Sequence, residues 1–371
     1  MSDELATATP PDTEAPVPEK PTAAPSPVTG FLARVRRASA PAVDAGLQWV
    51  LETKHATYSF AALRILYGSI ILLVLVTSFP DRHYLWGVGS RFIDPVATTR
   101  GYPWIFEAVF NKSNAVAFDV AYLLLGFLAL LFTVGLLTRW VGPLVLLFWV
   151  GLAVNSTLLT NGGDTVLRIT LLFALFADLG GRWSVDSWLR KAGKKIDPNW
   201  FKRIPEWVGP LAHNTALILC AYQIILIYSS SAMFKLQGTE WLAGTATYYS
   251  LVLDVFRPFP WLNDLVTFWD FPVYALTYLT LALQLLFPVL LVWRPTRIVA
   301  LVGITGTHLG IGLFLGLWPF SLAMIALDFL FVRDATWLWA GALAREQWGR
   351  FRARKKQHGR RAAAPQPVAS D

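Results

Sequence analysis

The chain has 371 residues, of which 55% are hydrophobic, and its mean hydropathy is +0.47. A soluble domain of this length holds much less apolar material, so we expect an integral membrane protein. The formal net charge of +8 does not indicate nucleic-acid binding, because the basic residues lie beside apolar segments, where anionic lipid accounts for them. The single cysteine, Cys220, excludes an intrachain disulfide and a cysteine metal site.

Residues 1–56 form the first predicted region, an N-terminal tail. Residues 1–30 are rich in Pro, Ala, Thr and Glu and contain no apolar run, so we expect them to be disordered. Residues 31–50 mix basic and apolar side chains, which fits either an amphipathic helix on the membrane surface or a basic linker. Residues 57–335 make up the predicted transmembrane domain, and residues 336–371 form a basic cytoplasmic tail.

Apolar runs that approach the roughly 20 residues needed to cross a bilayer fill the predicted transmembrane domain. There are eight of them, over residues 59–79, 115–137, 141–159, 165–181, 211–234, 271–293, 297–315 and 317–332. The fourth and eighth are short, and only a turn at Gly316 separates the last two, so the count holds to within one. The predicted fold is an all-α, polytopic transmembrane helical bundle of about eight spans.

The distribution of Lys and Arg predicts the orientation, since these residues concentrate in cytoplasmic loops. Seven lie in residues 182–203 and more follow in residues 336–371, whereas the basic residues of the two long opposite loops, 80–114 and 236–270, are diluted by acidic ones. We therefore expect a multi-pass protein of the cell membrane with both ends in the cytoplasm. The two outer loops carry Trp residues and are long enough to form short helices or a lid over a cavity.

Ionisable residues at membrane depth are costly, so each is a candidate functional residue. The set comprises Arg64, Asp119, Asp164, Arg168, Asp178, Lys235, His308 and Asp328. Alternating helix directions put Asp119 near the outer start of the second span and four more residues toward the outer face, where those four could share one polar pocket: Asp164, Arg168, Lys235 and His308. The same reasoning puts Arg64, Asp178 and Asp328 toward the inner face.

Structural roles compete with functional ones at each of these outer positions. Asp164 and Arg168 are four residues apart, in reach of an ion pair, but Asp164 follows Asn161 and two glycines and could simply cap a helix. Lys235 could extend to the interface from a helix end. His308 could be a hydrogen-bonded packing residue on a glycine-rich helix.

Six short stretches of the sequence resemble the HTTM family, the horizontally transferred transmembrane domain. They are residues 161–168 (NGGDTVLR), 183–186 (WSVD), 223–236 (QIILIYSSSAMFKL), 241–245 (WLAGT), 307–309 (THL) and 316–320 (GLWPF). The same stretches are similar to the membrane half of vitamin K-dependent gamma-glutamyl carboxylase, and the similarity extends over residues 58–332.

The resemblance to the carboxylase implies a chemical role for Lys235, because the lysine at the matching position is regarded as the base that deprotonates vitamin K hydroquinone. At the rim of an apolar pocket, desolvation disfavours an ammonium group, so a neutral amine becomes accessible. The carboxylase has two adjacent lysines here and this chain has Phe234 in the first position. That departure argues against glutamate carboxylation itself.

Two hypotheses of different classes follow. In the first, the chain is a quinol- or lipid-linked membrane enzyme with Lys235 as base, His308 as proton relay or oxyanion donor, and a quinol such as menaquinol as ligand. Its expected substrate-binding residues are Asn161, Asp164, Arg168, Trp241 and Tyr248. In the second, the chain is a non-enzymatic membrane protein for the export, processing or immunity of a small peptide. The expected partners are membrane lipids with a quinone or a small peptide, and not nucleic acid.

Overall fold

The computed structural model describes residues 41–87, 89–90, 103–110, 114–156, 159–194 and 205–362. The chain divides into two units, residues 1–49 and 50–371, and the second contains all the helices discussed below. Of the predicted N-terminal tail, residues 1–40 lie outside the described part, and residues 41–51 are helical. The described residues form helices and connecting segments and include no strand.

Five helices are long and apolar enough to cross a bilayer: α2 (Thr57–Thr77), α6 (Ala115–Val134), α10 (Val208–Lys235), α14 (Asp270–Leu290) and α15 (Arg294–Leu315). Two shorter apolar helical segments accompany them: α7 (Thr138–Val154), and α16 (Trp318–Asp328) continued by η4 (Phe329–Phe331). These helices confirm the all-α membrane protein, but the count of about eight spans is not confirmed.

The remaining helices are shorter or lie outside the apolar runs. They are α3 (Arg82–Leu85), α5 (Trp104–Val109), α8 (Gly162–Ala174), α9 (Val185–Lys191), α11 (Thr239–Leu242), α12 (Ala246–Val252), η3 (Asp254–Phe256), α13 (Pro260–Thr267) and α17 (Asp334–Ala362). The expected short helices in the loop 236–270 are therefore present as α11, η3, α12 and α13.

The fourth predicted span is interrupted, since α8 ends at Ala174 although the apolar run continues to residue 181. The residues that follow leave the helix because their polar groups bond to other parts of the fold. The backbone N–H of Asp178 donates to Nδ1 of His213 at 3.0 Å, and the carbonyl of Gly180 accepts from the Ser184 hydroxyl at 2.6 Å.

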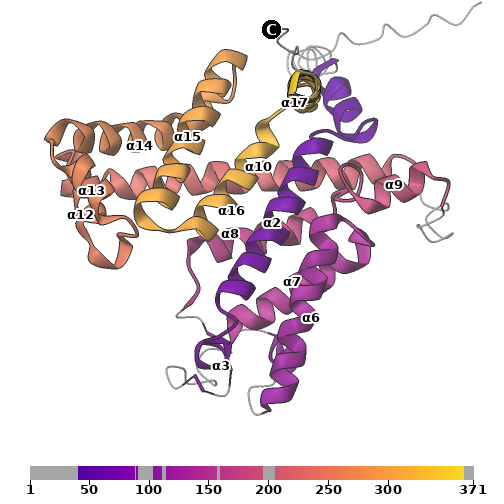
Figure 1. Ribbon diagram of the computed structural model, residues 1–371, viewed down its shortest axis with the longest axis horizontal. Coiled ribbons are helices and arrows are strands. Elements are labelled where there is room, and N and C mark those ends of the chain that lie inside the picture. The colour runs from indigo at the N-terminus through magenta and orange to yellow at the C-terminus, as the bar shows by residue number, and fades with distance from the viewer. Residues whose placement is uncertain are drawn as a thin grey trace, which may run out of the picture. The chain divides into compact units, whose positions relative to one another are not determined.

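Helix α2 is central to the bundle and packs against α6 on one side and α16 on the other. In Figure 1, α16 lies between α15 and α2, with α10 running past them. Helix α10 in turn packs against α14 and α8. At the α14–α15 contact, a Cβ on Gly303 would lie 2.8 Å from a methyl group of Leu283, so the Leu283 side chain would have to shift to make room for a larger residue.

The fully buried Arg64 of α2 joins three segments at one end of the bundle. Its guanidinium donates to the carbonyl oxygens of Phe132 at 2.7 Å and Thr133 at 2.6 Å, in the last turn of α6. It also donates to the carbonyl oxygen of Trp183, just before α9, at 2.6 Å. The carbonyls at a helix C-terminus have no partner within the helix. The guanidinium N–H groups of Arg64 provide hydrogen-bond donors for them, which apolar side chains cannot do.

Asp186 of α9 caps the N-terminal end of a helix, α7. Its carboxylate accepts from the backbone N–H groups of Leu137 at 2.8 Å and Thr138 at 2.9 Å, and from the Thr138 hydroxyl. Since these groups begin α7, the buried carboxylate caps that helix from a distant part of the sequence.

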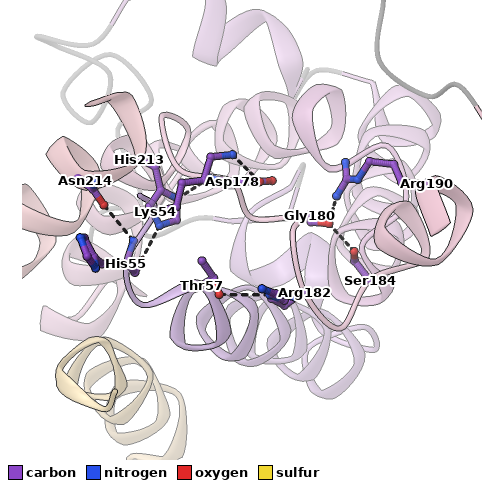
Figure 2. A network of polar contacts seen from close by, with 10 residues as sticks. All are labelled: Lys54, His55, Thr57, Asp178, Gly180, Arg182, Ser184, Arg190, His213 and Asn214. Carbon is purple, nitrogen blue, oxygen red and sulfur yellow. Dashed lines mark hydrogen bonds and ion pairs between the residues drawn. The ribbon is translucent and has the colours of Figure 1, made fainter. Parts of the chain in front are cut away.

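A second polar network fixes the start of α10 to the segment before α2 (Figure 2). His213 accepts from the Asp178 N–H through Nδ1, so its Nε2 carries the proton of the neutral ring and donates to the His55 carbonyl at 2.6 Å. The Asn214 amide donates to the carbonyls of Val50 and Thr53 and accepts from the His55 N–H. These bonds hold α10 at its first turns.

Lys54 and Asp178 form an ion pair in the same network, at 2.7 Å (Figure 2). Burial raises the pKa of the Asp178 carboxyl, but Lys54, through its charge and its hydrogen bond, together with the smaller effects of Arg190 and His213, brings the pKa below its ordinary value. Both side chains remain about one-third exposed, so the pair contributes modestly to stability.

Candidate functional site

One face of α10 carries three polar side chains near its end. Tyr228, Ser231 and Lys235 are spaced by three and four residues, which places them on the same side of the helix. This side faces α14. Lys235 reaches Gln284 there, and the ring of Tyr228 packs edge-on against Phe287 with centroids 4.7 Å apart. The candidate site is built along this α10–α14 contact.

The amine of Lys235 has neutral partners. Nζ donates to the Ser231 hydroxyl at 2.6 Å and to the Gln284 side-chain carbonyl at 2.8 Å. The Trp241 ring lies beside it, with its centroid 5.1 Å from Nζ. Within the described part of the chain, no carboxylate lies within 4.0 Å of this amine. Lys235 is half-buried and directed at α14, which differs from a side chain that simply extends into water.

His308 belongs to a buried cluster contributed by three helices. The Tyr228 hydroxyl on α10 lies 2.8 Å from a carboxylate oxygen of Asp328 on α16 and 3.0 Å from Nε2 of His308 on α15. If the hydroxyl donates to Asp328, its oxygen is free to accept from the His308 Nε2–H. All three side chains are 0–1% exposed.

Two atoms of this cluster have no hydrogen-bond partner among the described residues: Nδ1 of His308 and Oδ1 of Asp328. Leaving such atoms unpaired in a buried setting is costly, so they are of interest as groups kept available for a proton or a ligand. Tyr228 lies two turns before Lys235 on α10, and this shared face relates the cluster to the amine. No hydrogen bond or ion pair joins Lys235 directly to His308 in the described structure.

The expected depth of Asp328 requires correction. Sequence topology put Asp328 toward the inner face and His308 toward the outer face, but both bond to Tyr228. The reason is that α15 and α16 are neighbours joined by the turn at Gly316. Each residue lies roughly two to three helical turns from that turn, so the two reach a similar depth.

Asn161 and Asp164 form a capping box at the start of α8. The Asn161 side chain accepts from the Gly163 N–H at 2.7 Å, and the Asp164 carboxylate accepts from the Asn161 N–H at 2.8 Å. Arg168 donates to the backbone carbonyl of Asp164 and to the Thr165 hydroxyl, each at 3.3 Å.

The expected side-chain ion pair between Asp164 and Arg168 is not present among these described residues, since Arg168 bonds to the backbone carbonyl of Asp164 instead of its carboxylate. Phe320 connects this region with the buried cluster. It packs against Gly163, and its ring centroid lies 5.6 Å from that of His308. The four outer residues therefore occur in three separate settings: the α8 start, the Lys235 amine and the His308 cluster.

The segment that carries Trp241 and Tyr248 is fixed to the neighbouring long helices. The Tyr278 hydroxyl donates to the Leu242 carbonyl at 2.9 Å, and the Asn263 amide donates to the carbonyls of Leu251 and Phe314. Trp241 thus lies beside Lys235 as part of an anchored cover. Tyr248 is 43% exposed and its ring contacts that of Tyr249, so the structure gives it no direct link to Lys235.

A cavity of about 700 Å³ lies elsewhere, between the starts of α7 and α10 and the residues that follow α8. Lys54, Arg190 and Trp140 are among its lining residues, whereas Lys235 and His308 are not. The described residues contain no group of three or more His, Cys, Asp or Glu that could hold a metal ion.

Sequence reasoning missed Ser231, Gln284 and Tyr228 as parts of the site. Ser231 and Tyr228 carry a signal, since their spacing from Lys235 matches one helical face. Gln284 is a polar residue inside an apolar run and could have been selected by the same rule that selected charged residues.

The HTTM domain model matches residues 53–337, well over half of the chain. The chain belongs to the HTTM family. No curated protein and no solved structure matches it, so the resemblance to the membrane half of the carboxylase has no homologue to support it. Two of the stretches that carried the family resemblance have structural roles here: residues 161–164 cap α8, and residues 183–186 bond to Arg64 and cap α7.

The Tyr228 hydroxyl should be a measurable source of stability. Tyr228→Phe keeps the ring against Phe287 but leaves His308 and Asp328 without their shared partner, at a cost of about 1–3 kcal/mol. Thermal unfolding of the detergent-purified protein should show a lower midpoint. Tyr222→Phe, which removes a hydroxyl from an exposed side chain of the same helix, should leave the midpoint unchanged. Equal midpoints for the two variants would contradict the assigned bonds.

Proposed function

We propose that this chain is a membrane enzyme whose site removes a proton from the hydroxyl group of an apolar, quinol-like ligand, with Lys235 as the base. The observation that carries the proposal is the setting of the Lys235 amine. It is half-buried at the end of a transmembrane helix and bonds to the neutral side chains of Ser231 and Gln284, with no carboxylate partner among the described residues.

The proposed step is a proton transfer. The ligand O–H bond breaks, the lone pair of the neutral Nζ forms the new N–H bond, and the electron pair stays on the ligand oxygen as a quinolate. The oxygens of Ser231 and Gln284 accept hydrogen bonds from the amine and so orient its remaining lone pair. The Trp241 ring supplies a flat apolar surface for an aromatic ligand and a favourable contact for the ammonium that forms.

His308 is proposed as the proton relay. Its Nδ1 has no partner among the described residues, and its Nε2 contacts Tyr228, which lies on the same face of α10 as Lys235. Trp241 is retained as a ligand contact. Asn161 and Asp164 are engaged in the cap of α8, so a role for them, for Arg168 and for Tyr248 in binding remains a prediction.

Lys235→Arg should separate a base from a positively charged anchor. Arginine keeps the charge, but it does not lose its proton in this pH range and so provides no neutral base. Purified wild-type protein in nanodiscs, given a short-chain naphthohydroquinone without oxygen, should show the absorbance of the hydroquinone anion below the pH at which the free compound ionises. Lys235→Arg should bind the compound in its neutral form, and Lys191→Arg, on distant α9, should behave like the wild type.

An unchanged anion absorbance in correctly inserted Lys235→Arg would exclude Lys235 as the base. Absence of binding to the wild-type protein would argue against the quinol ligand altogether and favour the non-enzymatic peptide-handling hypothesis.

We also propose that both ends of the transmembrane domain face the cytoplasm of the cell. The beginning and end of this domain meet, because Asp334 accepts from the backbone N–H groups of Thr57 at 3.1 Å and Tyr58 at 3.0 Å. The Lys54–Asp178 pair adds the segment before α9 to this same end. This supports an even number of crossings, and the excess of basic residues there supports the cytoplasmic side.

A cysteine at position 194 in a Cys220→Ala background should test this orientation. An impermeant maleimide should label Lys194→Cys after the cells are opened and not in intact cells. Labelling in intact cells would reverse the proposed orientation.

A further inference from the structure

Helix α17 begins directly after η4 and is attached to the bundle by its first turn. Asp334 bonds to the start of α2, and the Trp337 indole N–H donates to the Ser59 hydroxyl at 3.0 Å. The Trp337 ring also packs edge-on against those of Trp183 and Phe329, with centroids 5.5 and 5.4 Å away. The side of α17 that carries Trp337 therefore faces the first turn of a membrane-spanning helix.

The same side of α17 continues beyond the bundle with aromatic residues that nothing else in the described chain covers. Ala344, Trp348 and Phe351 follow Trp337 at intervals of seven, four and three residues, which places all four on one face. Trp348 and Phe351 are each 57% exposed and stack on each other with centroids 5.8 Å apart. An exposed aromatic stripe of this kind needs an occupant.

The positive charge of α17 indicates what binds this aromatic face. From residue 345 onward it carries eight basic residues: Arg345, Arg350, Arg352, Arg354, Lys355, Lys356, Arg360 and Arg361. Against them stands one acidic residue after Asp334, namely Glu346, which pairs with Arg350 at 2.6 Å. Arg352 lies over the Trp348 ring. An aromatic face edged by arginines is typical of a helix at the surface of an anionic bilayer.

The direction of α17 agrees with such a position. Figure 1 shows α17 end-on beside the start of α2, which is seen from the side, so α17 crosses the direction of α2 instead of extending it. A helix that runs across a membrane-spanning helix at its end lies along the bilayer surface. Because Trp337 contacts Ser59 in α2, the aromatic face is the one turned toward the bilayer.

We propose that α17 is an interfacial membrane-binding helix that recognises anionic phospholipid. Trp348 and Phe351 insert at the level of the headgroups, and the arginines beside them bind lipid phosphates. The proposal is independent of the chemistry at Lys235, since it uses other residues at another part of the bundle.

Two alanines on opposite faces of α17 provide a matched test. In the full-length Cys220→Ala protein, a nitroxide is attached at Ala344→Cys, on the aromatic face, or at Ala342→Cys, on the opposite face. The protein is placed in nanodiscs of phosphatidylcholine with phosphatidylglycerol, or of phosphatidylcholine alone. Spin relaxation then reports access of dissolved oxygen, which concentrates in the bilayer, and of a nickel chelate, which stays in water.

In the anionic nanodiscs, the oxygen-to-nickel access ratio should be several-fold higher at position 344 than at position 342. The difference should shrink in phosphatidylcholine alone, at high salt, and in the double variant Arg345→Gln with Arg352→Gln. Equal nickel access at both positions in anionic nanodiscs would overturn membrane binding. A difference that persists in phosphatidylcholine at high salt would overturn the requirement for anionic lipid, and exclusion of both reagents at position 344 would indicate a protein partner instead.

Discussion

The buried guanidinium of Arg64 joins α2 to the last turn of α6 and to the segment before α9. The Phe132 carbonyl also accepts from the Gly135 N–H at 3.1 Å, so Arg64 matters most for the carbonyls of Thr133 and Trp183, since an unpaired carbonyl in apolar surroundings costs several kcal/mol. Asp186 performs the complementary task for the first amide groups of α7. Together these two side chains let the chain end one helix and begin the next within a few residues without leaving polar backbone exposed to hydrocarbon.

This fixed end explains how α10 can hold a site at its other end. His213 and Asn214 secure its first turns to residues 50–55, and one face of the helix then carries Tyr228, Ser231 and Lys235 toward α14, α15 and α16. Several buried side-chain atoms of the described residues have no hydrogen-bond partner, and two of them, Nδ1 of His308 and Oδ1 of Asp328, lie in the same cluster beside Tyr228. An arrangement that leaves these atoms available while satisfying the backbone is consistent with a site for proton transfer.

The sequence was sufficient to predict the long helices because α2, α6, α10, α14 and α15 are each a nearly uninterrupted apolar run, and length alone separates such runs from a soluble core. It failed at α8, where the same apolar character continues past Ala174 but His213 and Ser184 bind the backbone of the following turn. His213 is distant in sequence, and hydropathy carries no information about either hydrogen bond.

Some parts of the candidate site could be predicted from the sequence and others could not. Lys235 and His308 could be selected because charge at membrane depth is rare, and the cap formed by Asn161 and Asp164 follows a local pattern. The bonds from Tyr228 to His308 and Asp328 could not be predicted, because they depend on α15 and α16 meeting at equal depth beside α10. Arg64 could be selected as a charged residue at membrane depth. That it binds the last carbonyls of α6 could not be predicted without knowing where α6 ends.

Mass spectrometry of the lipids that copurify with the protein tests the central claim most directly. The account predicts that a quinone is enriched in the extract of the wild-type protein relative to the membranes from which it came, and that the Trp241→Ala variant, which lacks the ring beside Lys235, loses this enrichment. A wild-type extract with the same quinone content as the bulk membrane lipid would contradict the proposal that the Lys235 site serves a quinol-like ligand.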